Sequence, residues 1–188
     1  MSLDEQPLAG NVTAGVVRVG DTVRRPVGPW TDTAVAGFVP PEPAGWRVAI
    51  APDGADLVCH HDAAPWNLVR ADRGWVLIDW DGAGPGTRRW ELAYAAQAMA
   101  GMRPDRPVAE SARRLRALVD GYGLDGAARP ALAATLGRRA WAMYALLRDG
   151  ARDGMQPWAR IFTADGAYWR AAAAYLDAYV EDWTRALE

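Results

Sequence analysis

The 188-residue chain contains no lysine, so all 21 of its basic residues are arginines. Cysteine occurs only as Cys59, which excludes an internal disulfide. Histidine occurs only as the adjacent pair His60 and His61, so a zinc site built from several imidazoles has no further histidine to recruit. Disulfide scaffolds and histidine-rich zinc proteins are therefore the first classes that the sequence argues against.

The chain also has no large excess of charge of either sign and no long apolar run. The formal net charge is −2 at pH 7, so the chain has no general attraction to polyanions, and we expect no nucleic-acid partner. It has neither a long uncharged apolar run nor a basic segment followed by an apolar stretch at its N-terminus. We therefore expect no membrane partner and a cytoplasmic location. Hydrophobic residues make up 51% of the chain, enough to bury one good core.

The most informative segment is residues 58–69, with the sequence VCHHDAAPWNLV. Pro65 breaks a helix and disfavours the α conformation at the residue before it, so residues 60–66 are predicted to form a shaped loop. Asp62 and Asn67 can then face one cavity. The neighbouring histidines also raise the alternative of a metal-dependent hydrolase, which the absence of a further imidazole argues against.

A predicted hairpin follows this loop. Residues 68–70 and 75–78 are short apolar runs on either side of a turn signal at 71–74, the pattern of two antiparallel strands. Such a hairpin returns Asp79 close to Asn67. An amide oxygen beside a carboxylate suits Mg²⁺ better than zinc. With Asp62 to position an attacking hydroxyl, these groups are the ones that phosphoryl transfer needs.

These motifs together resemble the large lobe of the aminoglycoside phosphotransferase and choline kinase family. The resemblance rests on HHDAAPWN at residues 60–67, IDW at 78–80 and WELA at 90–93. The protein-kinase catalytic loop and its metal-holding Asp have the same order and similar spacing. The resemblance extends in pattern from about residue 37 to the C-terminal end, with a shorter echo in residues 10–30.

The resemblance implies roles for individual residues. It makes Asp62 the catalytic base, makes Asn67 and Asp79 ligands of Mg²⁺ at the nucleotide, and gives His60 the task of shaping the catalytic loop. Glu91 would tie the following helix to the loop backbone. The implied cofactors are ATP or GTP as phosphoryl donor and magnesium, and the implied partner is a small hydroxyl-bearing acceptor.

The absence of lysine bears directly on nucleotide binding. Kinases usually place a Lys from a small-lobe strand on the nucleotide phosphates. Residues 16–26 read as two short strands around a Gly-Asp turn, and Arg25 or Arg24 is the candidate phosphate contact there. Arginine keeps the charge, but its planar fork is larger than an ammonium, so the replacement is not conservative.

The predicted fold is α+β and protein-kinase-like, and consists mainly of the helical large lobe with its catalytic loop and β-hairpin. Residues 1–30 are predicted to be a remnant of the small β lobe, residues 31–57 an irregular connector, and residues 58–188 the large lobe. The connector is rich in Pro, Gly, Ala and Asp and shows no sustained periodicity, so it cannot supply a further sheet. The resemblance therefore leaves most of the small lobe and the adenine-gripping hinge without a counterpart.

Helices are predicted for the remainder of the chain. Thr87 is the expected N-cap of a first helix that ends near Gly101. Helices follow at 108–120, 129–148 and 166–187, the last with Asp165-Gly166 as its start signal. Their apolar stripes are expected to build the core.

Several side chains near the motif have a structural interpretation. Cys59 is expected to pack as a small apolar residue at the end of a buried strand. Asp81 is interpreted as an exposed turn residue, with a place beside Asp79 at a second metal as the alternative. Arg88 and Arg89 either bind an anion or are solvated or paired with Glu91. The tryptophans are expected to pack beneath the site, with a stacking surface for an amine as the alternative; they are Trp66, Trp75, Trp80 and Trp90.

The sequence thus favours a small-molecule kinase that transfers the γ-phosphoryl group of a nucleotide to a hydroxyl. The missing lysine and small-lobe segment motivate a second hypothesis, an inactive family member that serves as a binding module. A third is a truncated form of a longer kinase. The pattern leaves the acceptor and the oligomeric state open, because side chains on large-lobe helices cannot be placed from sequence.

Overall fold

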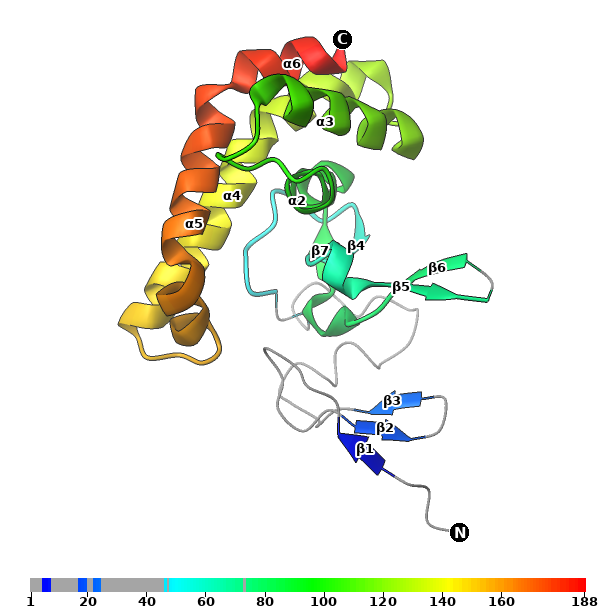
Figure 1. The fold of residues 1–188 in the computed structure, drawn as a ribbon, viewed down its shortest axis with the longest axis vertical. Coiled ribbons are helices and arrows are strands. Elements are labelled where there is room, and N and C mark those ends of the chain that lie inside the picture. Colours follow the sequence, from blue (N-terminus) through cyan, green and yellow to red (C-terminus); the bar gives the residue numbers. More distant parts are fainter. Residues whose placement is uncertain (1–4, 8–16, 20–21, 25–45, 47, 73) are drawn as a thin grey trace.

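Helices form most of the C-terminal half of the molecule, and small antiparallel sheets precede them (Figure 1). The computed structural model describes residues 5–7, 17–19, 22–24, 46, 48–72 and 74–188. This mixture agrees with the predicted α+β class. The candidate phosphate contact Arg25 and the predicted connector up to residue 45 lie outside the described residues, as do the turn residues 20–21.

Three short strands form an antiparallel sheet near the N-terminus. They are β1 (Glu5–Pro7), β2 (Val17–Val19) and β3 (Thr22–Arg24), in the order β1-β2-β3. In the register of β2 and β3, Val17 lies opposite Arg24 and Val19 opposite Thr22. The two strands predicted in residues 16–26 are therefore confirmed, whereas β1 was not foreseen.

A two-stranded sheet closes the segment that carries the motifs. Its strands are β4 (Leu57–Cys59) and β7 (Gly84–Gly86), with Cys59 opposite Gly84. A Cβ atom on Gly86 would lie 2.8 Å from the sulfur of Cys59, so the close approach of the two strands requires glycine there. The pairing of β4 with β7 therefore fixes both ends of the segment 60–83, which contains the motif residues.

Between β4 and β7 the chain forms a loop and the predicted hairpin. The 3₁₀ helix η2 (Pro65–Asn67) leads into β5 (Leu68–Ala71) and β6 (Gly74–Leu77), and a second 3₁₀ helix, η3 (Trp80–Gly82), follows. In the register Leu68 lies opposite Leu77 and Arg70 opposite Trp75, so the predicted hairpin is confirmed. The residue before Pro65 is extended, as expected.

Five α-helices complete the described part of the chain. They are α2 (Arg88–Met99), α3 (Val108–Tyr122), α4 (Arg129–Arg152), α5 (Trp158–Ala178) and α6 (Val180–Leu187), with the 3₁₀ helix η4 (Gly126–Ala128) before α4. The oxygen of Thr87 accepts a hydrogen bond from the backbone nitrogen of Trp90, so the predicted N-cap is confirmed. Figure 1 shows the two longest helices, α4 and α5, packed side by side.

The prediction for the last helix is wrong. Instead of one helix over residues 166–187, α5 begins eight residues earlier at Trp158 and the chain breaks at Tyr179 before α6. Gly166 lies inside α5, where an added Cβ atom would come within 2.7 Å of the ring of Phe162. The glycine therefore accommodates an aromatic ring and does not mark a helix start.

Two groups of buried side chains form the core. The larger joins α2, α3, α4, α5 and α6, and its largest fully buried side chains are Met102, Leu115, Leu132, Leu136, Leu176, Trp183 and Leu187. The smaller joins the motif loop to three helices through Ala64, Tyr94, Leu147 and Trp169. The loop is thus packed directly on the helical body. In the described part, no helix has the length and apolar character to cross a membrane.

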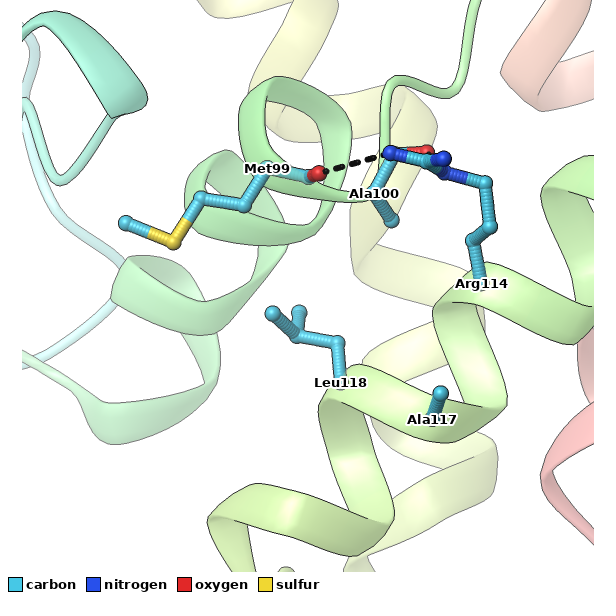
Figure 2. Close-up of a pocket in the computed structure, with 5 residues that line it drawn as sticks. All are labelled: Met99, Ala100, Arg114, Ala117 and Leu118. Carbon is cyan, nitrogen blue, oxygen red and sulfur yellow. Dashed lines mark hydrogen bonds between the residues drawn. The ribbon is translucent and has the colours of Figure 1, made fainter.

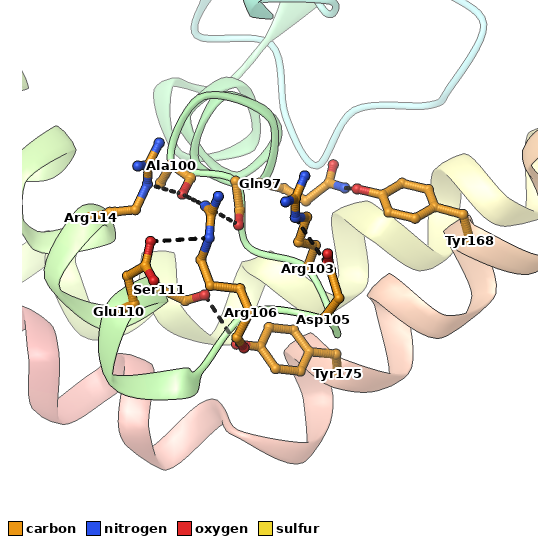
Figure 3. Close-up of polar contacts among 11 residues, drawn as sticks. Gln97, Ala100, Arg103, Asp105, Arg106, Glu110, Ser111, Arg114, Tyr168 and Tyr175 are labelled. Atoms are coloured by element: carbon orange, nitrogen blue, oxygen red, sulfur yellow. Dashed lines mark hydrogen bonds and ion pairs between the residues drawn. The ribbon is translucent and has the colours of Figure 1, made fainter.

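The C-terminal end of α2 is fixed by arginines of the neighbouring segment (Figure 3). Arg106 donates hydrogen bonds to the carbonyl oxygens of Ala100 and Gly101, and Arg114 donates to that of Ala100 at 2.7 Å. The hydroxyl of Tyr175 on α5 is hydrogen-bonded to Ser111 on α3. These bonds satisfy the last carbonyls of α2 and fix its axis, and with it the residues at its other end.

Candidate active site

His60 lies in the loop between β4 and β5 and holds it together through hydrogen bonds of both ring nitrogens. Its Nε2 atom donates a hydrogen bond to the carbonyl of Ile78 at 2.8 Å, and its Nδ1 atom accepts one from the backbone nitrogen of Asp62 at 3.3 Å. The buried ring also packs edge-on against Trp80. Because both ring nitrogens are used within the loop, His60 connects the start of the loop to the end of the hairpin.

Asp62 presents a carboxylate that three side chains hold. Its Oδ1 atom accepts a hydrogen bond from the hydroxyl of Tyr94 at 2.6 Å. Its Oδ2 atom accepts one from the amide of Asn67 at 2.7 Å and a longer one from the indole of Trp66 at 3.3 Å. The group is half-buried, so it is oriented by the protein and still open to a ligand.

Asn67 and Asp79 lie at the same end of the hairpin. The amide nitrogen of the buried Asn67 also donates to the backbone carbonyl of Asp62 at 2.8 Å, which leaves Oδ1 as its coordinating atom. The backbone nitrogen of Ile78 donates to the carbonyl of Asn67 at 2.9 Å, so the next residue, Asp79, is brought alongside. Asp79 is exposed and adopts the left-handed conformation, with φ of 68°.

The donor set fits Mg²⁺ and not a metal held in a protein cage. Within the described residues no group of three or more His, Cys, Asp or Glu side chains could hold a metal ion. An amide oxygen and a carboxylate are hard ligands, and Mg²⁺ commonly takes one or two such protein ligands and completes its shell with water and substrate phosphates. Asn67 and Asp79 therefore match a cation that arrives with a nucleotide.

Glu91 in the first turn of α2 is hydrogen-bonded to the backbone of the loop. Its Oε2 atom accepts a hydrogen bond from the backbone nitrogen of His61 at 2.9 Å, so the expected anchor between this helix and the loop is confirmed. His61 has φ of 64°, and its Nε2 atom is hydrogen-bonded to the carbonyl of Pro85 at 3.1 Å. Burial lowers the pKa of its imidazole, which favours the neutral ring in this position.

Arg139 on α4 is a part of the site that the sequence analysis missed. It is 2% exposed, and its Nη2 atom donates to the carbonyl of His61 at 3.0 Å. Its guanidinium lies 4.6 Å from the ring centroid of Tyr94. A signal was present, because Arg139 continues the helical stripe of Leu132 and Leu136 and so lies on the buried face of α4.

The prediction that the tryptophans pack beneath the site is wrong for three of the four. Trp66 is 61%, Trp75 64% and Trp80 46% exposed, and only Trp90 is buried. Trp75 lies on the β5–β6 hairpin, which projects away from the helices in Figure 1, and Trp66 and Trp80 lie in the 3₁₀ helices that flank this hairpin. Apart from Trp90, these rings therefore lie at the surface, where the indole of Trp66 contacts Asp62.

Arg89 and Cys59, which are close to the motif in sequence, have structural roles. Arg89 pairs with Asp53 at 2.6 Å and not with Glu91. Cys59 is buried at the end of β4, as expected, and burial raises the pKa of its thiol to about 12. Arg24 ends β3, and Arg25 lies beyond the described residues.

A pocket of about 320 Å³ lies at the far end of α2 and does not include the motif residues (Figure 2). It is lined by Met99, Ala100, Arg114, Ala117 and Leu118. Arg114 uses its Nε atom to bind the carbonyl of Ala100, so its charge is already engaged at the helix end. The carboxylates of the loop and hairpin, and not this pocket, are therefore the candidate site.

One comparison with known proteins gave a match. A model of the phosphotransferase enzyme family matches residues 41–134, half of the chain. The matched range includes Asp62, Asn67, Asp79, Glu91 and Tyr94, whereas Arg139 lies beyond it. Searches of curated proteins and of solved structures gave no match.

Proposed function

The chain belongs to the phosphotransferase enzyme family, and we propose that it transfers the γ-phosphoryl group of ATP to a hydroxyl of a small molecule. One observation carries this proposal. The carboxylate of Asp62 is held in one orientation by Tyr94 and Asn67, and a backbone bond from Ile78 to Asn67 brings the chain at Asp79 alongside. Phosphoryl transfer depends mainly on such positioning and on stabilising the charge of the phosphates.

The chemistry at Asp62 is that of a positioned base. The hydroxyl oxygen of the acceptor forms a bond to the γ-phosphorus, the bond from that phosphorus to the β–γ bridging oxygen breaks, and ADP leaves. The proton of the hydroxyl passes to the carboxylate of Asp62. The hydrogen bond from Trp66 to Oδ2 is long and exposed, so the acceptor hydroxyl takes the place of this indole on Oδ2.

The nucleotide side of the site is assigned to the hairpin. Asn67 and Asp79 would hold Mg²⁺, which when bound neutralises charge on the β- and γ-phosphates. The hydrogen bonds of the Asn67 amide nitrogen to Asp62 fix the direction of its oxygen. We further propose Arg25, or its neighbour Arg24, as the phosphate contact in place of the lysine that the chain lacks.

The absence of lysine favours one competing function, a binding module without turnover. Loss of the usual point charge on the nucleotide phosphates would weaken the hold on ATP while leaving the loop folded. The two functions differ in a simple way, because only an enzyme needs Asp62 as a base.

The experiment that tests the proposal is the release of ADP from ATP in the presence of Mg²⁺, with water or an added alcohol as acceptor, because ADP leaves in either case. The Asp62→Asn variant keeps the size of the side chain and should lower the rate on the order of a hundredfold or more. Asp105→Asn is the matched control, because Asp105 is exposed and paired with Arg103 on the segment between α2 and α3. Equal rates for wild type and Asp62→Asn would contradict the proposal, and ATP binding without any release would favour the binding module.

A further inference from the structure

We propose that Tyr94 and Arg139 are positioning residues that fix the carboxylate of Asp62 for the incoming acceptor, a role that rests on the proposed function of Asp62. Tyr94 acts through its hydroxyl and Arg139 acts through the ring of Tyr94 and the backbone of His61. Neither residue is expected to touch the substrate, because both are buried.

The hydroxyl of Tyr94 is a permanent donor to Asp62. The two oxygens lie 2.6 Å apart, in the range of a hydrogen bond to a charged acceptor, and the phenol is buried on α2. Burial, together with the neighbouring Asp62, raises the pKa of Tyr94 well above its ordinary value, so the hydroxyl keeps its proton.

The hydrogen bond of Tyr94 decides which oxygen meets the acceptor. The terminal torsion of a free aspartate is broad, so its two oxygens exchange places readily. Here Oδ1 is tied to α2 by Tyr94, while Oδ2 accepts a short bond from Asn67 and a long, exposed one from Trp66 that an acceptor can replace. The carboxylate therefore arrives with Oδ2 already turned toward the acceptor, and little reorientation remains to be done during the reaction.

Arg139 contacts the residues on both sides of the hydrogen bond between Tyr94 and Asp62. Its guanidinium lies over the ring of Tyr94 and, at 5.5 Å, over that of Trp90. Its Nη2 atom binds the carbonyl of His61, the residue directly before Asp62. A single side chain of α4 thus fixes the ring that donates to the carboxylate and the backbone that carries it.

Burial of the Arg139 guanidinium costs free energy of folding, which argues against a role in stability alone. In the described part, the buried side-chain atoms without a hydrogen-bond partner belong to His61, Trp90 and Arg139. Two of these atoms, Nε and Nη1, are on Arg139, and burial lowers the pKa of its guanidinium. A buried ion pair adds little net stability, because the cost of desolvating its charges offsets their attraction. The presence of Arg139 beneath the loop is explained by what it positions.

Tyr94→Phe removes only the hydroxyl and tests the proposal directly. With ADP release from ATP in the presence of Mg²⁺ as the assay, we expect kcat to fall about tenfold to a hundredfold, with KM for ATP changed less than about twofold. In the Asp62→Asn background the same change should have no further effect, because Tyr94 acts through Asp62. Tyr175→Phe is the control, since Tyr175 is also a buried phenol with a hydrogen bond, to Ser111, but lies away from the loop.

Arg139→Met separates positioning from packing. We expect kcat to fall by about tenfold or more, measured at a temperature at which the variant is fully folded. Arg138→Met removes the neighbouring, exposed arginine and should leave kcat unchanged. A lower unfolding midpoint with an unchanged kcat would show that Arg139 serves stability alone and would overturn its part of the proposal.

The outcomes distinguish this proposal from the proposed function. A full kcat in Tyr94→Phe, with Asp62→Asn still inactive, would overturn the positioning role and leave the function intact. A measurement that needs no turnover is the ¹³C resonance of the Asp62 carboxyl carbon, assigned by its loss in Asp62→Asn. It should shift in Tyr94→Phe and stay in place in Tyr175→Phe, and an unchanged resonance in Tyr94→Phe would also overturn the proposal.

Discussion

The carboxylate of Glu91 and the backbone nitrogen of His61 are joined by a hydrogen bond of 2.9 Å, although they belong to a helix and a loop 30 residues apart. This bond connects the first turn of α2 to the residue before Asp62. Thr87 holds the same turn from the other side, because its hydroxyl accepts from Trp90 and donates to Asp53 at 2.6 Å. The first turn of α2 therefore helps to fix the backbone next to Asp62, and with it the position of the Asp62 carboxylate.

Glu91→Gln should lower the free energy of unfolding by about 1–3 kcal/mol. The substitution removes the charge from a hydrogen bond to a backbone nitrogen and leaves the buried Arg139 with less compensation for its own charge. Urea unfolding followed by circular dichroism measures the difference. Glu110→Gln is the matched control, because the side chain of Glu110 is 41% exposed in its ion pair with Arg106, and a pair at the surface contributes at most about 1 kcal/mol. Equal losses in the two variants would contradict the anchoring role.

Thr87→Ala should destabilise the fold by about 1–2 kcal/mol, since it removes the N-cap of α2 and the partner of Asp53. The same measurement on Thr163→Ala provides the comparison. Thr163 is exposed within α5 and its hydroxyl bonds only to the carbonyl four residues earlier, where alanine is the better helix former. The idea fails if the Thr163 variant loses as much stability as the Thr87 variant.

Short-range signals account for the features that were predictable. The cap at Thr87 acts on a residue three positions later, and the strands on either side of residues 71–74 pair with each other, so both are written in adjacent sequence. The motif around Asp62 was recognisable for the same reason. The Asp-Gly pair at 165–166 misled, because glycine also occurs inside a helix where an aromatic ring such as that of Phe162 packs closely.

Long-range contacts account for what was not predictable. Arg139 reaches the loop from 78 residues away, and nothing local distinguishes it from the exposed Arg138 beside it except its place on the apolar stripe. Trp66, Trp75 and Trp80 were assigned to the interior because tryptophan is usually well buried. Their exposure depends on which elements cover the hairpin, and that is a property of the whole fold.

The thiol of Cys59 should resist labelling in the folded protein. It is 2% exposed and its pKa is raised to about 12, so at pH 8 only about one molecule in ten thousand carries the reactive thiolate. We expect a disulfide reagent such as dithionitrobenzoate to label it only at the rate of unfolding, and rapidly in 8 M urea, where both the burial and the raised pKa are lost. Rapid stoichiometric labelling without denaturant would contradict the buried position.

The raised pKa of the Cys59 thiol also predicts that the folded protein loses stability at alkaline pH. The pKa of Cys59 is about 12 in the fold against an ordinary value of 9.0, so between these values the folded thiol keeps a proton that the unfolded chain releases. Stability is therefore fully present below pH 9 and falls as the pH rises toward 12, by at most about 1.4 kcal/mol per pH unit. Urea unfolding at pH 8 and pH 10 should show a steeper loss for wild type than for Cys59→Ala, and parallel losses would count against the burial effect.

Asp79→Ala should abolish the magnesium dependence of nucleotide binding. Trp80 is next to Asp79 and exposed, and Trp66 contacts Asp62, so ATP bound at the hairpin should change the tryptophan fluorescence. In the wild-type protein we expect a saturable change with ATP that requires Mg²⁺, because the proposed site takes one of its two protein oxygens from Asp79. Asp72→Ala is the matched control, since Asp72 is an exposed carboxylate in the turn of the same hairpin and should leave the titration unchanged. Magnesium-dependent saturation that survives in Asp79→Ala would place the cation elsewhere, and the absence of any saturation in the wild-type protein at millimolar ATP would remove the nucleotide from this site.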